Sequence, residues 1–156
     1  MVVPLPGLAV SAVVFGKLPA HGDFVARGVA GDARAGLDAW LTGSLVVARE
    51  ALGDAFDDRF DQAQSWQAEG KGVVGAIAPS RDRAGRRFPL LLLAGDATAE
   101  QCEDLLYRAI AQGWEVDTLL AQAGPAPRGV VERWWSGAGT DRTGAMPADL
   151  LLAMLA

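Results

Sequence analysis

Residues 72–93 read GVVGAIA, PSRDRAGRRFP and LLLL in direct succession. The two outer runs are short, apolar and bounded by glycine or proline, a pattern that is typical of buried strands. The segment between them places four arginines within residues 81–87, on the connection between the two strands. The chain as a whole is acidic, with a formal net charge of −5. A loop with this much positive charge on such a chain is expected to bind a specific carboxylate or phosphate group, either inside the fold or on a partner.

Outward from this stretch, apolar runs and turn residues predict the remaining strands and the helices. Further strands are expected over residues 12–15, 65–68 and 130–135, besides the pair 72–78 and 88–94. A first helix is expected from an N-cap at Asp32 to Gly53, followed by a short helical turn within 54–64. A second long helix is expected from a cap at 96–98 to about Gln122, with Gly113 as a possible break. A last helix is expected over 147–156, with Pro147 at its start.

This order of elements predicts an α+β fold, a mainly antiparallel sheet with helices packed against it. At 156 residues the chain is expected to form one domain over residues 12–156, after a flexible leader over 1–11. The single cysteine, Cys102, excludes an intramolecular disulfide and fits a reducing compartment. The acidic balance argues against nonspecific nucleic-acid binding. The apolar N-terminus is too short and too interrupted to span a bilayer, so a cytoplasmic protein without membrane insertion is expected.

Two groups of short motifs resemble the TagF family, also called ImpM, of type VI secretion-associated proteins. The first group is GKLP at 16–19, GDF at 22–24 and RG at 27–28. The second is PS at 79–80, DR at 82–83, GR at 85–86 and FPL at 88–90. DAWL at 38–41 and WW at 134–135 also fit the family pattern.

The resemblance implies a cytoplasmic accessory protein of the type VI secretion system, with no enzyme activity, no cofactor and no metal. It further implies a post-translational repressor that acts by protein–protein binding to the forkhead-associated scaffold protein of that system. The residues expected to bind a partner or to form the motifs are Lys17, Pro19, Gly22, Asp23, Phe24, Ser80, Asp82, Arg83, Gly85 and Arg86.

The arginine loop has two interpretations that can coexist. It can form an anion or partner site, or Arg83 or Arg86 can pair with Asp23 or Asp82 and tie two loops together. A tie of this kind also pre-organises a binding surface.

Two other functions are compatible with the residues. A small hydrolase or transferase would use His21 with Asp23 or Asp82, and arginines to hold an anionic substrate, although no nucleophile elbow motif accompanies them. An adaptor would instead dock a peptide on a sheet edge or on the pair at 134–135, of which one ring is expected in the core.

Remaining candidate sites have simpler interpretations. Cys102 lies on the apolar side of an expected helix, where a lone cysteine behaves as a small hydrophobic residue. One histidine and one cysteine are too few for a zinc site in a monomer. The acidic run at 54–61 lacks calcium-loop spacing and is expected to be a solvated face. No phosphate-binding loop motif is present, and the glycines at 70–75 indicate a turn that enters a strand.

Overall fold

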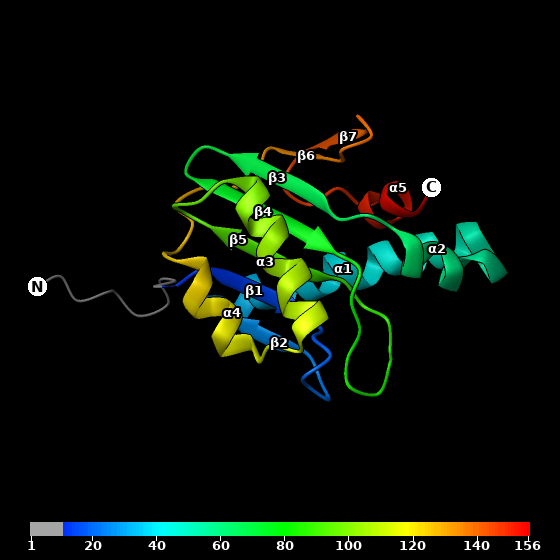
Figure 1. Ribbon diagram of the computed structural model, residues 1–156. Helices are drawn as coiled ribbons and strands as arrows, with labels where there is room; N and C mark the ends of the chain where they lie inside the picture. Colours follow the sequence, from blue (N-terminus) through cyan, green and yellow to red (C-terminus); the bar gives the residue numbers. More distant parts are fainter. Residues whose placement is uncertain (1–10) are drawn as a thin grey trace, which may run out of the picture.

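The computed structural model describes residues 11–156. Its centre is a sheet in which every strand pairs antiparallel with its neighbours, in the order β2-β1-β5-β4-β3-β6-β7 (Figure 1). The strands are β1 (Val13–Gly16), β2 (Val25–Arg27), β3 (Trp66–Gly70), β4 (Val73–Ala78), β5 (Leu90–Ala94), β6 (Arg133–Trp135) and β7 (Asp141–Thr143). The expected α+β class with a mainly antiparallel sheet is therefore confirmed.

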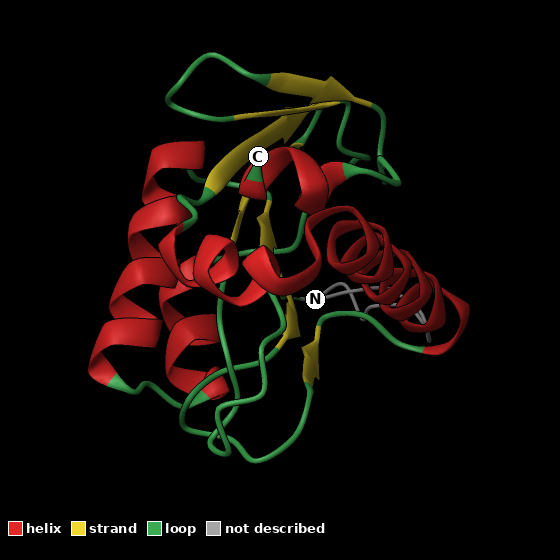
Figure 2. Cartoon of the chain, turned by 90° about the vertical axis from the view of Figure 1, so that its right-hand side faces the viewer, coloured by secondary structure: helices red, strands yellow, loops and turns green. Residues whose placement is uncertain are grey.

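Helices cover both faces of this sheet, as the view in Figure 2 shows. The helices α1 (Gly31–Leu52), α2 (Phe56–Gln62) and α5 (Leu150–Leu155) pack on one face. The helices α3 (Ala99–Gln112) and α4 (Val116–Ala123) pack on the other. A 3₁₀ turn, Gly53–Ala55, joins α1 to α2.

The leucine run of β5 is explained by this two-sided cover. Leu91 packs in the cluster with α1, α2 and α5, whereas Leu90 and Leu92 pack in the cluster with α3 and α4. All three are fully buried. A strand covered on both faces carries a continuous apolar sequence, because successive side chains point to opposite faces and each meets a helix.

Helix boundaries agree with the sequence in part. Thr98 caps α3 as expected, and it forms a capping box with Gln101. Gly113, with φ 67°, ends α3 and divides the long expected helix into two. The expected cap at Asp32 is wrong: α1 begins at Gly31 after Ala30, which makes no side-chain capping bond, and Asp32 lies in the first turn.

Further differences concern the short strands β2 and β7 and the start of the last helix. The strands β2 and β7, of three residues each, were not expected from the sequence. The last helix begins at Leu150 rather than at Pro147. The leader predicted over 1–11 lies outside the described residues apart from Ser11.

The tryptophan pair on β6 divides as a strand requires. Trp134 is fully buried and its ring lies 5.4 Å from that of Trp40 on α1. Its indole N–H donates to the carbonyl of Gly144 at 3.1 Å. Trp135 is partly buried, with the guanidinium of Arg133 4.9 Å from its ring centre. One ring is therefore in the core, as predicted.

Two loops leave the same end of the sheet. Leu90, the first residue of β5, pairs with Gly16 at the end of β1 and with Ala78 at the end of β4. The β1–β2 connection and the β4–β5 connection therefore start side by side (Figure 1). We call residues 17–24 and 79–89 the paired loops.

Gly16 makes this close approach possible. Its φ is 133°, and a Cβ atom built on it would lie 2.0 Å from the carbonyl oxygen of Pro89. A residue without a side chain is required where two backbones come this close.

Candidate functional site

The paired loops are joined mainly through backbone acceptors of residues 17–24. The Ser80 hydroxyl donates to the Lys17 carbonyl at 2.7 Å, and the Arg83 N–H donates to the His21 carbonyl at 2.7 Å. The guanidinium of Arg83 donates to the carbonyl of Ala20. Arg86 donates through Nη2 to the Gly22 carbonyl at 2.9 Å. In these four contacts the loop at 79–89 supplies the donors and the loop at 17–24 supplies the backbone acceptors.

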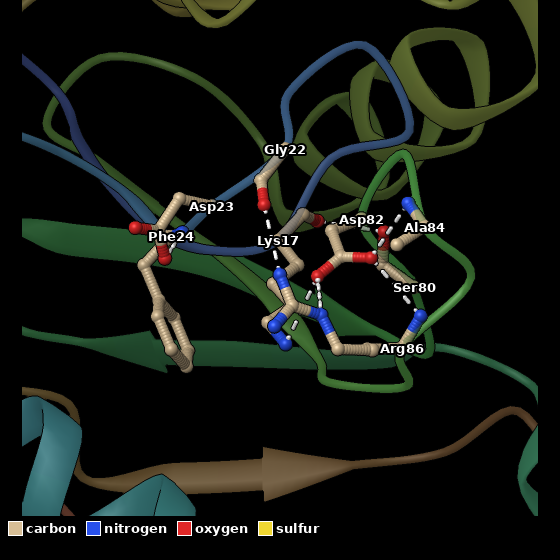
Figure 3. A network of polar contacts seen from close by, with 8 residues as sticks. All are labelled: Lys17, Gly22, Asp23, Phe24, Ser80, Asp82, Ala84 and Arg86. Atoms are coloured by element: carbon tan, nitrogen blue, oxygen red, sulfur yellow. Dashed lines mark hydrogen bonds and ion pairs between the residues drawn. The ribbon is translucent and has the colours of Figure 1, made fainter.

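A buried carboxylate, Asp82, organises the centre of this contact (Figure 3). One of its oxygens, Oδ2, lies 3.2 Å from Lys17 Nζ and 2.7 Å from Arg86 Nε. The other, Oδ1, accepts from the N–H groups of Ala84 and Arg86, each at 3.0 Å. We call Lys17, Asp82 and Arg86 the Asp82 network. Because two cations share one carboxylate, the network retains one positive charge.

Electrostatics keep Asp82 ionised. Burial raises the pKa of this carboxyl, but the bond from the Arg86 N–H and the bonds and charges of Lys17 and Arg86 outweigh that effect. The pKa is lowered to about 2. Hydrogen bonds and opposite charges that favour the ionised form act in this direction. Asp82 is therefore a structural anion over the whole physiological pH range.

Aromatic rings surround the ammonium group of Lys17. Nζ lies 4.7 Å from the ring centre of Phe24 and 5.9 Å from that of Phe88. The two rings meet edge to face with centres 4.8 Å apart, and Phe15 of the core contacts both. The ammonium is thus held by a carboxylate and by ring faces, which together offset the loss of hydration. Phe88 was not singled out from the sequence as a site residue.

The remaining predicted site residues have separate places. Asp23 is exposed, and its Oδ1 accepts from the Phe24 N–H at 2.7 Å rather than from an arginine. Gly85, at φ 86°, forms the turn of the arginine loop, and its N–H donates to the Asp82 carbonyl at 3.0 Å. Pro19 is half-buried in the turn before His21. The structure therefore contains the tie between Arg86 and Asp82, while Arg83 is tied to a backbone carbonyl.

Arg87 joins the arginine loop to α2. Its Nε and Nη2 donate to the two carboxylate oxygens of Asp61, each at 2.8 Å, and Nη1 lies 3.4 Å from Asp57. The bond to Asp61 raises the pKa of Arg87, and the same bond lowers that of Asp61. The acidic run is exposed to solvent, as expected, and two of its carboxylates also pair with Arg87. Their spacing of one helical turn was the signal available in the sequence.

A surface cavity of about 290 Å³ lies beside this contact. Phe60, Pro79 and Ser80 line it together with three charged side chains, Asp61, Arg81 and Arg87. Two of these three already pair with each other. The cavity therefore belongs to the junction between the loop and α2.

His21 has a structural partner. Its Nε2 accepts the backbone N–H of Val116 at 3.0 Å, which satisfies a donor at the start of α4. The first turn of a helix has such unpaired donors, and a neutral imidazole nitrogen can accept from one. Within residues 11–156 no hydrogen bond joins His21 to Asp23 or to Asp82.

Replacing His21 with alanine is expected to loosen the start of α4 while the paired loops stay formed. Loss of one hydrogen bond of this kind costs about 0.5–1.5 kcal/mol. Amide hydrogen exchange should accelerate at Val116 and its helical neighbours, with little change at Ala84 and Arg86, whose N–H groups bind Asp82. Unchanged exchange at Val116 would contradict the capping role.

Cys102 and metal binding offer no alternative centre. The cysteine is fully buried on α3, and burial raises the pKa of its thiol to about 11. A thiol with a pKa this high is a poor nucleophile at neutral pH. Among residues 11–156, no three histidine, cysteine or acidic side chains gather as metal ligands. In the same part of the chain, no helix has the length and apolar character needed to cross a membrane.

Comparison with protein families decides the assignment. The model of the TagF N-terminal domain, described as type VI secretion system-associated, matches residues 13–127. The chain belongs to this family. The TagF match begins at β1 and contains both paired loops, so the Asp82 network lies wholly within the family domain.

A solved structure is similar to this TagF chain over most of its length. It is the crystal structure of PA0076 from Pseudomonas aeruginosa PAO1, with 29% sequence identity and a TM-score of 0.63. The similarity covers 93% of this chain and 76% of PA0076. No match was found among curated proteins.

Proposed function

We propose that this TagF protein is a cytoplasmic, post-translational repressor of the type VI secretion system. It acts without catalysis, by binding the forkhead-associated scaffold protein of that system. The family assignment supports a role in type VI secretion.

The proposal rests on the division of the motif residues into buried ones that form structural bonds and exposed ones that remain on the surface. Lys17, Ser80 and Asp82 are buried and bonded to one another or to backbone groups. His21 is bonded to a helix start. Lys17, Ser80 and Asp82 hold the two loops in one fixed shape, whereas Phe24, Arg83 and Arg86 remain exposed on it. A rigid surface with exposed aromatic and arginine side chains suits protein binding, because little ordering is needed and these residue types are common in hot spots.

The experiment combines purified proteins with a secretion assay in cells. Titration calorimetry with the purified scaffold protein is expected to show saturable binding. Excess TagF protein in cells should lower type VI secretion, and deletion of its gene should raise it. His21→Ala is the matched control: it should bind and repress like wild type, because His21 lies on the α4 side of the loop.

Two results would contradict the proposal. If wild type fails to bind the purified scaffold protein, the proposed partner is wrong. If His21→Ala binds normally but no longer represses, a catalytic role for the histidine replaces the binding role.

A further inference from the structure

The exposed part of the paired loops carries two guanidinium groups, each anchored to a backbone carbonyl of the same loop. Arg83 donates to the carbonyl of Ala20, and Arg86 donates to that of Gly22, two residues further along the same loop. Arg83 is exposed, and the Arg86 side chain keeps 62% of its surface exposed. Each group is therefore fixed through part of its donor set, and its other N–H groups face solvent.

Phe24 adds an apolar element to the same surface. The Phe24 ring contacts the Lys17 ammonium and meets the Phe88 ring edge to face, yet 40% of the Phe24 surface remains exposed. In Figure 3 the Phe24 ring lies to one side of Lys17 and the Arg86 guanidinium, which overlap in this view. We call Phe24, Arg83 and Arg86 the basic–aromatic patch.

Charge selects the sign of what binds there. The patch and its support contain three cations, Lys17, Arg83 and Arg86, and two carboxylates, of which Asp82 is buried. One net positive charge remains on a protein whose formal net charge is −5. A positive area attracts acidic groups and repels basic ones, so an acidic partner is favoured at this patch.

The donors that remain free on this surface belong to arginine side chains rather than to the backbone. Phosphate sites converge several donors, commonly backbone N–H groups, on one anion. Here the nearby N–H groups of Ala84 and Arg86 already bind Asp82. The free donors belong to two separate guanidiniums, each able to take one carboxylate.

We propose that the basic–aromatic patch binds an acidic segment of a protein partner, with carboxylates on Arg83 and Arg86 and an apolar side chain against Phe24. This inference rests on the proposed function, since it names the chemistry by which the partner is recognised. Asp23 opposes the acidic segment from the edge of the patch.

The first test uses a synthetic peptide and does not require the scaffold protein. Acetyl-Glu-Leu-Glu-Leu-Glu-amide is titrated into wild type while the Nε–Hε signals of arginine side chains are followed by nuclear magnetic resonance. The signals of Arg83 and Arg86 should shift saturably, and that of Arg34, exposed on α1, should not. The same peptide with glutamine in place of glutamate should cause no shift. Unmoved Arg83 and Arg86 signals overturn the inference.

The second test uses variants that leave the Asp82 network intact. Arg83→Gln should weaken binding of the purified scaffold protein about tenfold, the effect of losing one charge-assisted contact. Arg34→Gln, the matched control, should bind like wild type. Asp23→Asn should bind about two- to fivefold more tightly, because an opposing exposed charge is removed.

The outcomes separate the two proposals. If wild type and Arg83→Gln bind the scaffold equally, the patch is not the contact and the inference fails while the proposed function stands. If wild type does not bind the scaffold at all, the proposed function fails, and the peptide titration alone decides whether the patch recognises acidic segments. Weaker binding by Asp23→Asn also contradicts the inference.

Discussion

Asp82→Ala is expected to be among the most destabilising single substitutions in this protein. The substitution leaves the ammonium of Lys17, only 7% exposed, without its counter-ion. Removing one partner of a buried ion pair typically costs about 3–5 kcal/mol. It also leaves the N–H groups of Ala84 and Arg86 without their acceptor. Chemical denaturation followed by circular dichroism measures the loss.

Asp82→Asn removes the negative charge and keeps the backbone hydrogen bonds. The amide oxygen can still accept from the two backbone N–H groups, whereas its NH2 group cannot accept from Lys17 and Arg86, so their charge compensation and their side-chain hydrogen bonds are lost. This variant should therefore be more stable than Asp82→Ala and less stable than wild type. Asp104→Asn is the matched control, because its carboxylate is exposed and lies 3.8 Å from Arg108. A wild-type stability for Asp82→Ala would show that the network does not hold the loops.

The same carboxylate gives the protein an acid-sensitive element. The folded-state pKa of Asp82, about 2, lies below its ordinary value of 3.8. The group therefore contributes stability that is fully present above about pH 4 and is lost as the pH falls through about 2. Asp82→Asn should lack this contribution, so its stability should fall less steeply than that of wild type over this window. Parallel curves for the two proteins would contradict the assignment.

Gly16→Ala is the second substitution with a large expected effect. The new Cβ would overlap the Pro89 carbonyl, 2.0 Å away, and the residue would have to keep φ at 133°. Overpacking of this kind costs about 1–3 kcal/mol. Strained backbone adds about 1–3 kcal/mol. The ends of β1 and β5 should separate, and the paired loops should become accessible to protease.

Gly43→Ala is the matched control for this substitution. Gly43 lies in α1, is exposed, and would place its Cβ in open space. Replacing glycine with alanine in an exposed helix interior should stabilise the protein by up to about 1 kcal/mol. Opposite signs for the two variants in thermal and chemical denaturation are the expected result. Equal behaviour would show that the close approach at Pro89 is not required.

Local patterns predicted much of the fold. The apolar runs at 72–78 and 88–94 are two paired strands because their composition and their flanking turns are both local signals. The cap expected at residues 96–98 is found at Thr98 for the same reason. The strands β2 and β7 were not predicted, because three residues are too few to show the alternation of apolar and polar side chains that marks a strand. The cap was wrongly predicted at Asp32 because α1 begins one residue earlier, at Gly31, which has a positive φ of 57°. Helix propensities do not predict a start at such a residue.

The site was predictable only where its partners are close in sequence. Arg86 and Asp82 lie four residues apart, and their pairing was one of the alternatives that the sequence left open. The pairing of Lys17 with Asp82 depends on the register between β1 and β5, which a single sequence does not specify. The use of the Ala20 and Gly22 carbonyls as anchors was equally hidden, because backbone acceptors have no residue signature.

The place of β1 in the sheet has a consequence for synthesis of the chain. β1 lies between β2 and β5, and β5 is made only after the helices α1 and α2 and the strands β3 and β4 have been translated. During translation β1 and β2 can therefore pair only with each other, and a two-stranded hairpin is at best marginally stable in water. We expect Val13, Val14 and Phe15 to lack their β5 partners until residue 94 has left the ribosome. A chaperone that binds short apolar segments would find its target there.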